Sequence, residues 1–142
     1  MTGNAELLNF IYQNSEMGIQ TIPQLLNIVQ DEKLLVQLKS QLEEYNEINK
    51  EAKELLNQNS FTEKDISSFE KMTAYIMINM KTLTDKTSSH IAQMMIIGSN
   101  MGVIDAIKNI RKYSNAEQNI LSLMKRLLKF EENNIKDLKS FL

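Results

Sequence analysis

Residues 31–57 read DEKLLVQLKSQLEEYNEINKEAKELLN, and this stretch decides the fold class. Apolar side chains recur in it every three or four residues, which is the spacing of one face of an α-helix. That face includes a single amide, and its members are Leu35, Leu38, Leu42, Tyr45, Asn49, Ala52 and Leu56. The opposite face carries glutamates and lysines at helical spacing, as a solvated surface does. The pattern predicts one amphipathic helix over Asp31–Asn57, with Asp31 as its N-cap.

The same periodicity extends toward both ends of the chain. Among 142 residues there are only four Gly and one Pro, so little interrupts helix formation. Four further helices are predicted, over Ala5–Val29, Thr62–Leu83, Ser89–Tyr113 and Ala116–Phe141. The length suits one domain, and we therefore predict a single all-α domain over residues 1–142. The helix Ser89–Tyr113 is apolar nearly all round, so we expect it to be the most buried element.

Composition excludes several classes of protein. The chain has no Cys, which excludes disulfides, thiolate zinc sites and cysteine nucleophiles. Its net charge of −2 gives no general attraction to nucleic acid, so no nucleic-acid partner is expected. The most apolar stretch, residues 91–107, contains polar side chains and is shorter than the roughly 20 residues of a membrane span. The first residues lack the basic and apolar regions of a signal peptide, and we expect a cytoplasmic protein with no membrane partner.

A short internal repeat indicates how the helices are paired. Residues Glu16–Ile19 resemble residues Asn100–Val103, and both tetrapeptides contain Met-Gly. The same shift along the chain superimposes the turn at Gln30–Asp31 on the turn at Ser114–Asn115. Each half is therefore predicted to be an antiparallel helical hairpin, because short connections join antiparallel neighbours. The two hairpins are joined by a long segment that contains the helix predicted over Thr62–Leu83.

Two hairpins with one long crossover resemble the ferritin-like superfamily, and the chain looks like a divergent member of it. The local matches are Leu42–Asn46 and Leu128–Leu142, in the second helix of each hairpin. The resemblance implies an all-α, ferritin-like up-down four-helix bundle with a helical crossover segment. It also implies a mid-bundle site for two metal ions, with a Glu on the first helix of each hairpin and Glu-x-x-His on the second. In this chain Asn134 stands where the resemblance expects the His after Glu131.

Counting residues outward from the two turns places several polar side chains near one level, halfway along the bundle. This candidate polar layer consists of Asn14, Asn49, Asn100, Glu131 and Asn134. Only Glu131 is acidic, and the single histidine, His90, lies away from the layer. A two-metal centre needs several carboxylates and imidazoles, so we predict neither a metal nor a cofactor. Glu131 is instead expected to have an elevated pKa or hydrogen-bond partners among Asn14, Asn49, Asn134 and Tyr45.

Three functions are compatible with this sequence. The first is a non-enzymatic binding or structural bundle that has lost the metal site of its relatives. The second is a carboxylate-based metal-binding protein, in which further acids join Glu131 around one ion. The acids that could do so are Glu16, Glu43, Glu44 and Asp105. The third is phosphotransfer through His90, although the Lys three residues on and the Gly four residues on that such modules have are missing.

The helix over Met72–Leu83 carries more apolar surface than one small bundle buries. Tyr75, Ile76, Met77 and Ile78 cover most of its circumference. Exposed apolar patches of this kind mark protein interfaces. We therefore predict a homodimer that forms through this helix and through Ser89–Tyr113 beside it.

Overall fold

The computed structural model describes residues 2–63, 75–76, 79–81 and 83–142. Every regular element among them is helical, which confirms the predicted all-α class. The elements are α1 (Asn4–Leu26), α2 (Glu32–Gln58), α4 (Ser88–Lys112), α5 (Gln118–Leu138) and a short 3₁₀ helix η2 (Lys139–Phe141). Most of the helix predicted over Thr62–Leu83, with Met72 in it, lies outside the described residues. Its described members at 75–76 and 79–81 are helical.

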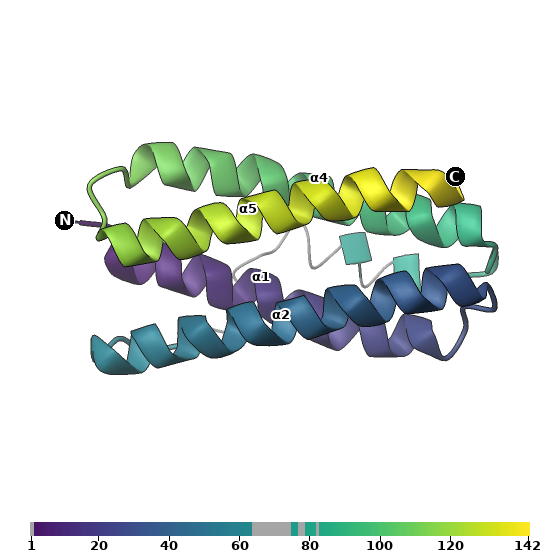
Figure 1. Cartoon of the computed structure of the whole chain (residues 1–142), viewed down its shortest axis with the longest axis horizontal. Coiled ribbons are helices and arrows are strands. Elements are labelled where there is room, and N and C mark those ends of the chain that lie inside the picture. The colour runs from purple at the N-terminus through teal and green to yellow at the C-terminus, as the bar shows by residue number, and fades with distance from the viewer. Residues whose placement is uncertain (1, 64–74, 77–78, 82) are drawn as a thin grey trace.

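The four long helices lie side by side as two antiparallel hairpins, α1 with α2 and α4 with α5 (Figure 1). Helices α1 and α5 run in one direction, and α2 and α4 run in the other (Figure 1). Helix α2 ends at the opposite end of the bundle from the start of α4, so the connection between them spans its length (Figure 1). Among the described helices, none has the length and apolar character that crossing a membrane requires.

The N-termini of α2 and α4 are capped by the residue just before each helix, whereas the N-terminus of α5 also depends on a distant residue. Asp31 caps α2 as predicted, because its side chain accepts a hydrogen bond from the Leu34 amide at 2.9 Å. The sequence places the cap of the next hairpin at Ser88 or Ser89, and this is wrong by one residue. Thr87 has the extended backbone of an N-cap, and its hydroxyl oxygen accepts from the His90 amide at 3.2 Å. The first turn of α5 depends on a distant residue, since the Glu117 amide donates to the side chain of Asn4.

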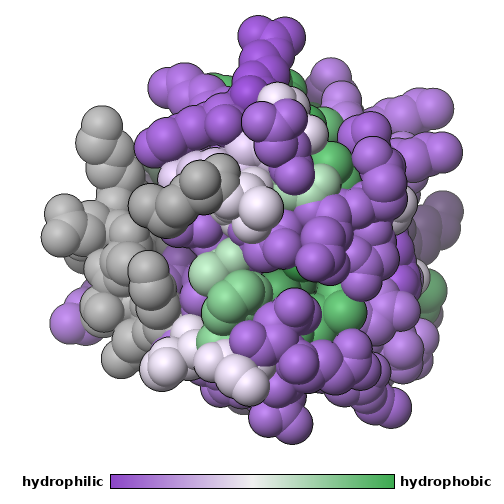
Figure 2. Space-filling model, turned by 90° about the vertical axis from the view of Figure 1, so that its left-hand side faces the viewer, coloured by the Kyte–Doolittle hydropathy of each residue, from purple (hydrophilic) through white to green (hydrophobic). Residues whose placement is uncertain are grey.

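The apolar core consists of two clusters, one in each half of the bundle. One cluster contains Leu7, Ile11, Ile48, Met124 and Leu127 together with their neighbours. The other contains Ile22, Leu25, Leu34, Leu38 and Ile91. On the end face of the bundle, apolar residues are visible in the middle, with hydrophilic residues above, below and to the right of them (Figure 2). Buried polar side chains occupy the level between the two clusters, and this level is the candidate site.

Helix α1, and not α4, is the most buried of the described helices, contrary to the prediction. It buries 14 of its 23 residues, whereas α4 buries 8 of 25. The reason is position, since α1 packs against α2, α4 and α5 together. Helix α4 leaves one side outward, where Ile104 is 47% exposed. Apolar composition alone therefore does not rank the burial of helices in this bundle.

Candidate functional site

Four of the five residues of the candidate polar layer are buried together at mid-bundle. Asn14, Asn49, Glu131 and Asn134 are each at most 5% exposed. Asn100 is exposed and does not belong to the layer. Its neighbour Ser99 is buried instead. One residue along a helix turns a side chain by about 100°, so an error of one position moves it from core to solvent.

A hydrogen bond between Tyr45 and Glu131 is the centre of this layer. The Tyr45 hydroxyl on α2 donates to Glu131 Oε1 on α5 at 2.8 Å, and both side chains are buried. Burial raises the pKa of Glu131 to about 7, and hydrogen bonds from Tyr45 and Ser99 oppose the rise. Burial and the adjacent carboxylate raise the pKa of Tyr45 well above its usual value, so the phenol stays protonated. The Tyr45 ring also packs edge-on against Phe130, with centroids 4.8 Å apart.

Gly18 explains one part of the internal repeat, because it makes space for the Tyr45 ring. A Cβ atom at Gly18 would lie 2.5 Å from Cδ2 of that ring, which no side chain could tolerate without movement. The absence of a Cβ therefore lets α1 lie against the aromatic ring on α2. Gly98 on α4 is less constrained, since a Cβ atom there would have Ile76 Cδ1 as its nearest neighbour, at 3.0 Å.

A second set of hydrogen bonds joins α1 to α2 one turn away from Tyr45. Asn49 Nδ2 donates to the Ser15 hydroxyl at 3.0 Å. Ser15 in turn donates to the Ile11 carbonyl at 2.8 Å. Asn49 therefore hydrogen-bonds to α1 and not to Glu131, although the sequence analysis named it as a candidate partner of that carboxylate.

Several buried polar atoms of the layer have no hydrogen-bond partner among the described residues. Within the layer they are Asn14 Nδ2, Glu131 Oε2 and Asn134 Nδ2, and beside it both side-chain polar atoms of Gln41. Asn134 nevertheless lies near the Tyr45 hydroxyl, and its interaction with the phenol opposes the rise of the Tyr45 pKa. Leaving such a group unpaired costs about 1–3 kcal/mol. Asn14, Ser99 and Glu131 also line a small pocket of about 30 Å³, which has room for a water molecule. Gln41 and Asn134 instead line a surface groove between α2 and α5.

The donors of the layer do not fit the two-metal centre that a ferritin-like arrangement implies. They are one carboxylate, one phenol, hydroxyls and amides, whereas such a centre needs several carboxylates and imidazoles. The described residues contain no group of three or more His, Asp and Glu that could hold a metal ion. The chemistry available at mid-bundle is therefore hydrogen bonding by neutral groups around one carboxyl.

The acids proposed to join Glu131 are directed elsewhere. Glu16 lies 3.7 Å from Lys53, and Glu44 forms an ion pair with Arg126 at 2.6 Å. Glu43 is exposed, and Asp105 is half-buried on α4. The histidine suggested for phosphotransfer, His90, is half-buried in the first turn of α4. None of these residues shares the cavity beside Glu131.

Gln41, Ser15 and Ser99 belong to the site, and reasoning from the sequence missed them. Gln41 had a detectable signal, because Gln41, Tyr45 and Asn49 are four residues apart and therefore share one helix face. Ser15 had no such signal, and for Ser99 the count along the helix reached the right level but selected its neighbour Asn100. Serine is common on helix surfaces, and only the packing of α1 and α4 buries these two.

The chain has no match among models of protein families, among curated proteins or among solved structures. The indications of its function therefore come from the arrangement of its own residues.

Proposed function

We propose that this protein is a non-enzymatic binding or structural bundle of ferritin-like type that has no di-metal centre. The directions of the helices support the arrangement, because α1 and α5 run against α2 and α4 and a long connection joins the two hairpins (Figure 1). Ferritin-like bundles have one such long crossover. The short repeat around Gly18 and Gly102 supports an origin from two similar hairpins.

The hydrogen bond from Tyr45 to Glu131 is the observation that carries the proposal. It joins α2 to α5 at the level where a ferritin-like bundle would hold metal, and it uses the one buried carboxylate of the layer. The neighbouring side chains are amides and hydroxyls, which supply neither the charge nor the imidazoles that two divalent ions require. The chain also has no Cys and only one His, so it offers few nucleophiles or general bases.

Metal analysis distinguishes this proposal from the carboxylate-based alternative. The protein is purified without chelator, incubated separately with Fe²⁺, Mn²⁺ and Zn²⁺, desalted and analysed for bound metal. We expect far less than one ion per chain. One tightly bound ion per chain that is lost in Glu131→Gln and kept in Glu132→Gln would overturn the proposal. Glu132 is a matched control because it is the next residue and is exposed.

We also propose a cytoplasmic homodimer formed through the Met72–Leu83 helix. Two described residues of this helix, Tyr75 and Met80, are half-buried against the core of the same chain. The outward side of α4, with Ile104 exposed, extends the apolar surface available to a second copy. Light scattering on the full chain is expected to give twice the monomer mass of 16.4 kDa. A monomer mass at all concentrations tested would contradict the dimer.

A further inference from the structure

The small pocket beside Glu131 has one wall that lies at the surface of the bundle. Its lining residues come from all four long helices and from the segment between α2 and α4, and all but one of them are buried. The exception is Ile76, which is half-buried. The end of its side chain lies over Gly98, where a Cβ atom would be 3.0 Å from Ile76 Cδ1. Ile76 is therefore the outer wall of the pocket.

No described residue in the pocket balances a negative charge on Glu131. Its Oε1 accepts the hydrogen bond from Tyr45, whereas its Oε2 is buried and has no partner among the described residues. Helix α1 contributes Asn14 and Thr21 to the lining and α4 contributes Ser99, so both helices present neutral polar groups there. Tyr45 is the one other titratable residue of the lining, and its raised pKa keeps the phenol neutral.

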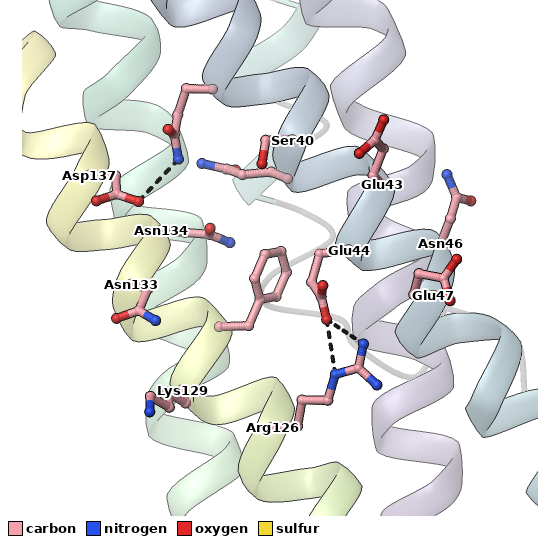
Figure 3. Close-up of a pocket in the computed structure, with 13 residues that line it drawn as sticks. Ser40, Glu43, Glu44, Asn46, Glu47, Arg126, Lys129, Asn133, Asn134 and Asp137 are labelled. Atoms are coloured by element: carbon pink, nitrogen blue, oxygen red, sulfur yellow. Dashed lines mark hydrogen bonds and ion pairs between the residues drawn. The ribbon is translucent and has the colours of Figure 1, made fainter.

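The charged side chains on the surfaces of the neighbouring helices face other partners. On the outer side of α2 and α5, Arg126 binds Glu44 at N–O distances of 2.6 and 2.9 Å (Figure 3). On α1, Glu16 lies 3.7 Å from Lys53. On α4, Asp105 does not line the pocket. The exposed charged residues of α5 beside Glu131 are Lys129 and Glu132. An ionised Glu131 therefore depends on water for its stabilisation.

The closed pocket admits too little water for this. Its volume of about 30 Å³ has room for one molecule, whereas an ionised carboxylate offers about four lone-pair sites. More water enters only when a wall moves. Ile76 is the wall that moves most easily, because its side chain has a flexible end and is partly exposed, while the other lining residues are held among packed helices.

We propose that Ile76 is the gate of a pH-operated switch: when Glu131 loses its proton, the Ile76 side chain leaves Gly98 and water enters the pocket. The proton passes to solvent, and the gate closes again when Glu131 is reprotonated. The open form is a minor one, and it exposes the buried lining of the pocket, including Met17 and Met95, to solvent. The switch goes beyond the proposed function and does not depend on a ferritin-like origin.

The frequency of opening follows from the protonation of Glu131 in the two forms. In the open form the hydrated carboxyl has its ordinary pKa of 4.5, whereas burial raises its pKa to about 7 in the closed form. Below pH 4.5 the carboxyl is neutral in both forms, and opening is rarest there. Between the two pKa values opening becomes about tenfold more frequent for each pH unit, and above pH 7 it becomes constant. The total rise is about 300-fold.

Thiol labelling measures this opening, because the chain has no Cys and one introduced thiol is unique. Thr21→Cys places the thiol in the lining, at a position that is 6% exposed. Ala106→Cys is the matched control, since Ala106 is 1% exposed and lies outside the lining. Each protein is labelled with dithiodipyridine in EDTA, from about pH 4.5 to about pH 8.5, with Glu131 and with Glu131→Gln. Dividing the two rates at each pH removes the effect of thiol ionisation.

For Thr21→Cys we expect the ratio of the rate with Glu131 to the rate with Glu131→Gln to rise from about 2 at pH 4.5 to about 300 above pH 8. The rate should not change in dilute urea, as is typical of local opening. Ala106→Cys should be labelled at least about tenfold more slowly at pH 8 and should accelerate with urea, because its labelling requires global unfolding. Adding Ile76→Ala should make Thr21→Cys react fast at pH 4.5 as well, since the outer wall is then missing.

Three results would overturn the gate. One is a Thr21→Cys ratio that stays constant with pH. Another is equal labelling of Thr21→Cys and Ala106→Cys with the same urea dependence, because the opening would then be global unfolding. The third is unchanged labelling in the Ile76→Ala protein, because the pocket would then open elsewhere. Circular dichroism checks that the Cys variants are folded, and Met95→Cys is a second probe in the lining. Failure here leaves the metal analysis, and hence the proposed function, unaffected.

Discussion

Glu131→Gln tests the central pair of the buried layer through the pH dependence of stability. Below pH 4.5, the ordinary pKa of the group, the carboxyl is neutral in both the folded and the unfolded chain. Its contribution to stability is fully present there. Between pH 4.5 and about 7 the unfolded chain ionises while the buried carboxyl stays protonated. The free energy of unfolding then falls by about 1.4 kcal/mol for each pH unit, because ionisation favours the unfolded state.

Between pH 4.5 and about 7 the free energy of unfolding falls by about 3 kcal/mol in total. Solvent screening does not reduce this value, because Glu131 is only 2% exposed. The Glu131→Gln variant keeps an oxygen that accepts from Tyr45 but does not titrate. We expect wild type and variant to have similar stability near pH 4.5. The variant should become more stable by about 3 kcal/mol near pH 8, where the wild type carries a buried charge.

Urea unfolding followed by circular dichroism, at steps from about pH 4.5 to pH 8, measures this difference. Other titrating groups occur in both proteins and cancel in the difference between them. The control Glu132→Gln, at an exposed position, should parallel the wild type across the range. A wild-type minus Glu131→Gln difference that stays constant with pH would refute the reasoning. It would mean that the carboxyl is hydrated in the folded chain.

Two smaller predictions concern helix packing and capping. Gly18→Ala should lower the free energy of unfolding by about 1–3 kcal/mol, because its Cβ would lie 2.5 Å from the Tyr45 ring. Gly98→Ala should be neutral or up to about 1 kcal/mol more stable, because only the flexible end of Ile76 must move while helix propensity improves. Equal effects of the two substitutions in urea unfolding would contradict this difference. Asp31→Ala should lower the free energy of unfolding by about 1 kcal/mol, because α2 loses its cap. An unchanged midpoint of urea unfolding would contradict this and would mean that water replaces the side chain.

Local patterns in the sequence were enough to predict the four long helices that the structure describes. The helical face from Leu35 to Leu56 predicted α2, and Asp31 predicted its cap, because both depend on residues within a turn or two. Leu35 and Leu42 are the exceptions on that face, since both are half-buried whereas their neighbours Leu34 and Gln41 are buried. The level of the polar layer also followed from counting along helices, and Asn14, Asn49, Glu131 and Asn134 are buried there. A helix has a fixed rise per residue, so its register along the bundle axis can be read from the chain.

Tertiary packing alone decided how those side chains pair. The rotation of α4 about its axis buries Ser99 and exposes Asn100, and nothing local to the sequence sets that angle. The Glu117 amide at the start of α5 donates to the side chain of Asn4, at the other end of the chain. The seam between α2 and α5 leaves Gln41 beside an open groove, and the neighbourhood of Tyr45 removes Glu131 from water. Helix formation is a short-range property, whereas burial, desolvation and pairing depend on residues that only the folded chain brings together.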